Sequence, residues 1–136
     1  MSAHIDPSRE QFEAFKALPR DTPIHMLNLI RYKEAAVYPA DHPNHGKGLS
    51  GADAYREYGR AIAPILARVG AKRQWGGGQL ECVVTGPAEP EWDDAFVMGY
   101  PSAAAFLEMV TDPEYRRHVA HRTAAVADSR LIRFAG

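Results

Sequence analysis

Apolar side chains occupy both the odd and the even positions of the run Ile24–Tyr32 (IHMLNLIRY), with few polar interruptions. A strand with one solvated face alternates apolar and polar residues, whereas a strand covered on both faces is apolar throughout. We therefore predict a β-strand here with a packing partner on each face.

A long amphipathic helix is predicted between Ser50 and Gly70. Ser50 is a favoured N-cap residue, and Gly70 suits the left-handed conformation that ends many helices. The apolar stripe between them repeats at spacings of three and four residues and consists of Tyr55, Tyr58, Ile62, Ile65 and Val69. This stripe needs a sheet or another helix to cover it.

Further elements are predicted from apolar spacing and from bordering Gly, Pro, Ser and Asp residues. They are a helix over residues 7–18 with Asp6 as N-cap, a strand over 71–85 that bends or bulges at Gly76 to Gly78, a strand over 95–100, a helix that Ser102 caps and Asp112 with Pro113 restarts, and a strand over 130–134.

Without the first helix, the order is strand, helix, strand, strand, helix, strand. This split βαβ pattern predicts a ferredoxin-like α+β fold, in which a four-stranded antiparallel sheet carries both helices on one face. The 136 residues fit one domain, with an accessory N-terminal helix in residues 1–22 and the core in residues 23–135.

The second face of the predicted sheet has no helix to cover it. In the strand over residues 95–100 we place the smaller side chains under the helices and the larger ones on the bare face. The predicted bare-face residues are Phe96, Met98 and Tyr100, joined by Trp75 and Met26. Soluble monomers avoid apolar faces of this size. We therefore predict a homodimer that pairs face to face, with a small-molecule cavity between each sheet and its helices.

Charge and composition exclude several classes of partner. The formal net charge is −1 and the charged residues are interleaved, so neither nucleic acid nor an anionic membrane is expected as a partner. The charged N-terminal residues are unlike a signal peptide, and no apolar run reaches about 20 residues, so a cytoplasmic location is expected. Cys82 has no second cysteine to pair with and is predicted to be a packed strand residue.

Three segments resemble one bacterial family. They are MLNLIRY at residues 26–32, YREYGRAIAPILARVGAK at 55–72, and FVMGYPSAAAFLEMVTDPEYRRHVAHRTAAVADSRLIRF at 96–134. These segments are similar to the domain of unknown function 1330 family. The resemblance implies a dimeric α/β-barrel protein. The wider superfamily is similar in shape to cofactor-free monooxygenases, muconolactone isomerases, polyketide cyclases and haem-binding peroxidases, and shape alone carries none of these activities across.

Three polar residues are candidates for catalysis. His118 is the candidate general acid or base because an imidazole titrates near neutrality. Asn28 interrupts the first apolar strand and Arg122 falls on an apolar helix stripe, so both need buried partners and both suit orienting a substrate. The alternatives are a backbone hydrogen bond for Asn28, a structural ion pair for Arg122, and a half-exposed histidine without a role.

Aromatic and cationic residues are candidates for lining the cavity. The predicted substrate-binding set is Tyr55, Tyr58, Arg73, Trp75, Met98 and Tyr115. Such a cavity with a cationic end suits a planar or enol-bearing acid, although aromatic residues at helical spacing also serve as plain core packing.

The long loop over residues 33–50 is a candidate lid and contains Asp41, His42 and His45. His118 and His121 add two imidazoles, but their spacing of three differs from that of familiar zinc helices. No metal and no other cofactor is therefore expected.

The leading hypothesis is a cofactor-independent isomerase, cyclase or monooxygenase that acts on a small carbonyl-containing or aromatic metabolite. The alternatives are a non-catalytic metabolite-binding or stress-response dimer, and haem binding through a cavity histidine.

Overall fold

The computed structural model describes residues 3–89 and 91–136. Its elements are α1 (Arg9–Ala17), β1 (Ile24–Tyr32), α2 (Gly51–Val69), β2 (Lys72–Gly76), β3 (Asp94–Tyr100), α3 (Ala103–Thr111), α4 (Pro113–Ala125) and β4 (Val126–Ala135).

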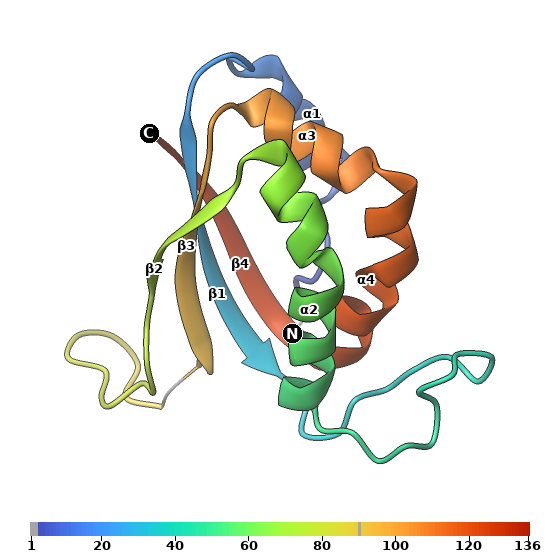
Figure 1. Cartoon of the computed structure of the whole chain (residues 1–136). Helices are drawn as coiled ribbons and strands as arrows, with labels where there is room; N and C mark the ends of the chain where they lie inside the picture. Colours follow the sequence, from blue (N-terminus) through green and yellow to red (C-terminus); the bar gives the residue numbers. More distant parts are fainter. Residues whose placement is uncertain (1–2, 90) are drawn as a thin grey trace.

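The four strands form one antiparallel sheet in the order β2-β3-β1-β4. The helices lie together on one side of this sheet (Figure 1). The order and the one-sided helices are those of the ferredoxin-like α+β fold, which confirms the predicted fold class. In the part of the chain that the structure describes, no helix is both long enough and apolar enough to cross a membrane.

Local capping explains where the longest helix begins and ends. The Ser50 hydroxyl accepts a hydrogen bond from the Asp53 amide at 3.0 Å, and the Asp53 carboxylate accepts one from the Ser50 amide at 3.2 Å. This reciprocal capping box satisfies amide groups that have no partner within the helix. Gly70 ends α2 in the left-handed conformation with φ of 81°. The sequence-based prediction of this helix is confirmed.

The core lies between the helices and one face of the sheet. Near the end of α2, Ile24 and Met26 of β1 pack with Ile65 of α2 and with Phe106 and Met109 of α3. Near the start of α2, a second group joins the sheet to the loop and to α4. Its buried members are Ile30, Tyr38, Ala54, Phe96, Ala124, Ala125 and Val126.

The predicted facing of β3 is wrong. Phe96 and Tyr100 are buried under the helices, and Met26, which pairs with Met98, is buried there as well. The bare face instead carries the smaller side chains of β3. Because the strands are apolar on both parities, no alternation marks the inner face, and side-chain size is a poor guide to it.

The opposite face of the sheet has no helix over it. Alternation along the paired strands places Leu27 and Leu29 of β1 there, next to Val97 of β3. Trp75, Ile132 and Phe134 lie on the same face and are 54%, 41% and 53% exposed. Trp75 is therefore where the sequence placed it, and Met26, Phe96, Met98 and Tyr100 are not.

Three boundaries differ from their predictions. Helix α1 is capped by Ser8 instead of Asp6, because Ser8 and Gln11 form a capping box. Strand β2 ends at Gly76, and residues 77–89, including the exposed Cys82, form no strand. The last strand starts at Val126 because α4 passes directly into it.

Candidate functional site

Tyrosine side chains from two helices meet above the sheet. Tyr55 and Tyr58 stand one turn apart on α2, and their ring centroids are 5.4 Å apart. The hydroxyl oxygen of Tyr58 lies 2.7 Å from that of Tyr115 on α4. Tyr58 is buried, whereas Tyr55 and Tyr115 keep part of their surface accessible. We call these residues, with Tyr32, Asn28, Arg73 and Arg122 described below, the tyrosine–arginine cluster.

Tyr32, at the end of β1, extends the row of rings towards the sheet. Its ring centroid is 5.4 Å from that of Tyr55, and its hydroxyl donates to the Asp94 carboxylate at 3.1 Å. Burial raises the pKa of the Tyr32 phenol, and the negative charge of Asp94 raises it further. Tyr32 therefore remains a neutral donor.

The other phenols of the cluster also stay protonated at neutral pH. Burial raises the pKa of Tyr55 to about 12, although the Arg122 charge opposes this rise. Burial also raises the pKa of Tyr58 well above its ordinary value, and the neighbouring Tyr115 adds to the effect. For Tyr115, burial raises the pKa while its bond with Tyr58 lowers it. The site thus offers neutral hydroxyl groups as hydrogen-bond donors and acceptors.

Arg122 of α4 brings a positive charge beside these phenols. Its side chain is only 12% exposed. The guanidinium donates to the carbonyl oxygen of Ile5 and to the Ser129 hydroxyl at 3.4 Å, and it lies 3.6 Å from the Asp6 carboxylate. One of these hydrogen bonds therefore holds the N-terminal segment and the other holds β4. The Arg122 charge also opposes the rise in the pKa of Tyr55 and Tyr58 that burial causes.

Arg73 supplies a second cation from β2. Its guanidinium carbon lies 4.9 Å from the centroid of the Phe96 ring, on the helix side of the sheet. The register shifts between Arg73 and Trp75, so this bulge turns the two side chains to opposite faces. Trp75 therefore lies on the opposite face of the sheet from the other residues of the predicted substrate-binding set.

Asn28 lies on the helix side of β1, between Phe96 and Leu131 on the neighbouring strands. Its amide nitrogen donates to the carbonyl oxygen of Met26 at 3.1 Å. This is the backbone bond considered from the sequence. The side chain is half-buried, so its carbonyl oxygen is the group that is open to a further partner. Met98 is also half-buried on this side of the sheet.

His118 lies in a different cluster. Its Nε2 atom is 3.7 Å from the Glu114 carboxylate, and its ring stacks on His121 at 6.2 Å between centroids. The Nδ1 atom of His121 is 2.7 Å from the Tyr38 hydroxyl. Burial lowers the pKa of His121, with His42 as the next contributor. The structure therefore groups Arg122 with the tyrosines and places His118 beside the loop.

The loop over residues 33–50 contributes to this second cluster. His42 stacks on the Tyr38 ring at 4.6 Å, and the His45 ring nitrogen lies 3.0 Å from the Tyr38 carbonyl oxygen. Within residues 3–89 and 91–136, no three His, Cys, Asp or Glu side chains are arranged to hold a metal ion. Asp41 is exposed.

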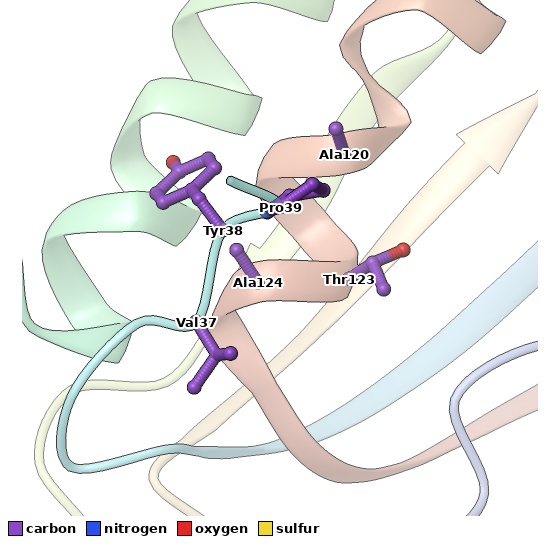
Figure 2. A pocket seen from close by; sticks show the side chains of 6 residues that line it. All are labelled: Val37, Tyr38, Pro39, Ala120, Thr123 and Ala124. Atoms are coloured by element: carbon purple, nitrogen blue, oxygen red, sulfur yellow. The ribbon is translucent and has the colours of Figure 1, made fainter. Parts of the chain in front are cut away.

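A shallow apolar hollow of about 480 Å³ lies where the loop passes α4. Figure 2 shows the side chains that line it. It is lined by Val37, Tyr38 and Pro39 of the loop and by Ala120, Thr123 and Ala124 of α4. A second hollow of about 390 Å³ lies between α1 and α3. Both hollows are distinct from the tyrosine–arginine cluster.

Sequence reasoning missed Tyr32, Asp94 and the Tyr38–His121 pair. Tyr32 is the last residue of an apolar strand, and this apolar pattern indicated packing and no polar role for its side chain. Asp94 opens the next buried strand, and a carboxylate at such a position is a usable signal because it requires a partner. No local signal links Tyr38 to His121, because they are far apart in sequence and meet only in the fold.

Comparisons with known proteins identify the family. The sequence profile of the family described as "domain of unknown function (DUF1330)" matches residues 49–134. The structure of methylated RPA0582 protein is 48% identical with a TM-score of 0.90, covering 100% of this chain and 96% of that chain. A second RPA0582 structure, described as a protein of unknown function from Rhodopseudomonas palustris, is 47% identical with a TM-score of 0.89, covering 99% and 98%.

A dimeric ferredoxin-like protein of unknown function from Thermobifida fusca is similar at 17% identity, covering 88% of this chain and 96% of that chain with a TM-score of 0.49. Among curated proteins, none matches. The matched region contains α2, α4, three of the four strands and most of the tyrosine–arginine cluster. Since the profile spans well over half of the 136 residues, this chain belongs to the DUF1330 family.

Proposed function

We propose that the chain binds a small metabolite with a carbonyl or carboxylate group at the tyrosine–arginine cluster. One observation carries this proposal: the hydroxyl of the buried Tyr58 pairs with that of the half-buried Tyr115, and the Arg122 charge acts on both. Neutral phenols and a guanidinium are donors that suit a substrate oxygen.

The chemistry that such a site favours is enolisation. A phenol that donates to a carbonyl oxygen binds the corresponding enolate more strongly, because the hydrogen bond strengthens as negative charge develops. Among the expected reaction classes, an isomerase or cyclase that passes through an enolate fits these donors and needs no cofactor. His118 stays outside this proposal because its contacts are with Glu114 and His121.

A non-catalytic binding protein is the second candidate. It is favoured by the pairing of Asp94, the carboxylate next to the cluster, with the Tyr32 hydroxyl. A carboxylate oxygen that accepts this hydrogen bond must first give it up before the same lone pair can take a substrate proton.

Phenylpyruvate is a suitable probe because it is a planar, enol-forming aromatic acid. Isothermal titration should show binding to the wild type and to Tyr100→Phe, whose hydroxyl contacts Met109 outside the cluster. Tyr58→Phe and Tyr115→Phe should each weaken binding by about tenfold, the loss expected for one hydrogen bond. Equal affinity in all four proteins would remove the cluster from the binding site.

Deuterium exchange at the probe's methylene carbon, which lies next to its ketone and loses a proton on enolisation, separates the two candidates. Exchange in deuterated water that the wild type accelerates, and that Tyr58→Phe slows, supports enolisation. Binding without any acceleration over buffer supports the non-catalytic protein instead.

We also propose that the protein is a homodimer joined through the bare sheet face. Trp75, Ile132 and Phe134 are exposed on this face, and the register places Val97 and Leu27 between Trp75 and Ile132. Together they form an apolar surface of the kind that marks interfaces. Ile132→Asp should disrupt this interface, so light scattering should show a monomer for the variant and a dimer for the wild type. Val37→Asp is the matched control, because Val37 is 64% exposed on the loop, away from this face. A wild-type monomer would refute the assembly.

A further inference from the structure

The connection between β2 and β3 contains an exposed apolar stretch. Residues 77–89, which we call the arm, contain Leu80, Cys82, Val83 and Val84, and Val84 is 89% exposed. In Figure 1 the arm projects beyond the sheet, away from the helices. A connection this long without regular structure is uncommon in a compact domain and usually has a function.

The arm has strand-forming residues but no strand to pair with. The run QLECVVT at residues 79–85 is rich in β-branched residues, and its sequence predicts a strand. The structure places Gly77 next to β3, where its amide donates to Ala95 at 2.8 Å. From Gly78 to Glu89, the described residues form no hydrogen bond with the rest of the chain. In a single copy the arm therefore has no hydrogen-bonded strand partner, and Cys82 and Val84 are exposed while Leu80 and Val83 are half-buried.

The charges of the arm and of the sheet face are opposite in sign. The arm contains Glu81 and Glu89 and no lysine or arginine. The sheet face carries cations at Lys72, Arg31 and Arg130, by alternation along β2, β1 and β4. The carboxylate near them, Asp128, already accepts hydrogen bonds from the His4 amide and from Arg130.

We infer that the arm of one copy packs on the β4 side of the sheet face of a second copy. Apolar arm residues would cover Ile132 and Phe134, and Glu81 would lie near Arg130. Each copy has one arm and one such face, so a two-fold dimer satisfies both at once without a further partner. This inference rests on the proposed homodimer and adds the element that completes the interface.

The native Cys82 provides a direct test. Wild type and the variant Cys82→Ser/Ile132→Cys, which carries a tag, are co-expressed and treated with oxidised glutathione. A disulfide forms only where the two Cα atoms approach to about 4.4–6.8 Å. We expect covalent heterodimer on a non-reducing gel, located by mass spectrometry to Cys82 and residue 132. The control variant Cys82→Ser/Val37→Cys should give only background.

The possible results distinguish failure of the arm inference from failure of the proposed homodimer. A dimer in which Cys82 pairs with position 132 no better than with position 37 overturns the arm inference and leaves the proposed homodimer standing. A monomer overturns both.

Charge reversal provides a second measurement without new cysteines. Glu81→Lys and Arg130→Glu should each raise the dimer dissociation constant about threefold to tenfold, and the double variant should recover most of the loss. Losses that simply add in the double variant would overturn the proposed Glu81–Arg130 proximity.

Discussion

The hydroxyl oxygens of Tyr58 and Tyr115 lie 2.7 Å apart and join α2 to α4 above the sheet. Removing either hydroxyl leaves the other without this partner in a largely buried setting, where hydrogen bonds contribute most. We expect Tyr58→Phe and Tyr115→Phe each to lower the free energy of unfolding by about 1 kcal/mol.

The double variant shows whether the two losses share one origin. A double-mutant cycle from urea unfolding should give a coupling energy of about 0.5–1.5 kcal/mol. Tyr100→Phe, combined with either variant, should give additive effects. A Tyr58–Tyr115 coupling near zero would mean that the bond contributes nothing to stability.

Two glycines of the same helix should respond oppositely to alanine. A Cβ atom at Gly51 would lie 2.8 Å from the carbonyl oxygen of Ala125 and press on the Lys33 backbone. Gly51→Ala should therefore destabilise the protein by about 1–3 kcal/mol or more. A Cβ atom at Gly59 meets nothing within 4 Å, so Gly59→Ala should stabilise it by about 0.5–1 kcal/mol.

Thermal and urea unfolding of both variants check this contrast. The pair shares a helix and a substitution, so helix propensity cannot explain a difference of sign. Equal effects would contradict the close approach of Gly51 to the backbone of α4.

The order of elements was predictable because caps and apolar periodicity are local signals. Ser50, Gly70 and Ser102 each mark a boundary that the structure confirms. The facing of β3 was not predictable in this way, because Phe96 and Val97 are both apolar and register depends on a distant strand.

The candidate site was harder to predict from the sequence than the fold. Tyr55, Tyr58 and Tyr115 meet because two helices pack on one sheet, which their spacing suggested. The bulge between Arg73 and Trp75 places these two side chains on opposite faces of the sheet, and no residue type in β2 predicts a bulge at this position. Whether His118 faces the tyrosines or the loop depends on how α4 is rotated about its axis, which its own sequence does not determine.

Stability should fall in mild acid because of His121. Burial lowers the pKa of His121 below its ordinary value of 6.5. The unfolded chain therefore binds the proton more tightly than the folded protein, and the folded state loses stability as pH falls through 6.5 and below. Above this window the contribution is fully present.

Urea unfolding at pH of about 7.5 and about 5 measures the effect. His121→Gln should show a smaller loss between these conditions than the wild type. An unchanged loss in His121→Gln would assign the acid sensitivity to other groups.

Arg122 should anchor the N-terminal segment. Its guanidinium holds the Ile5 carbonyl, and the neighbouring Ser129 hydroxyl donates to the His4 carbonyl at 2.6 Å. Arg122→Met should increase amide exchange in residues 4–8 and lower stability by about 1–3 kcal/mol. Arg117→Met, on the exposed side of α4, should change neither; a similar effect there would point to a general loss of helix charge.

The loop over residues 33–50 is fastened at both ends, because Ala35 pairs with Ser50 and the Val37 amide donates to Ala124 at 3.0 Å. Any opening motion must therefore pivot beyond these fastenings and displace only the tip, from about Pro39 to Gly48. This tip contains His42, whose ring centroid lies 5.3 Å from that of His121 on α4. Movement of the tip should therefore change the solvent access of this imidazole, whereas the Tyr58–Tyr115 hydrogen bond joins α2 to α4 without a contribution from the tip.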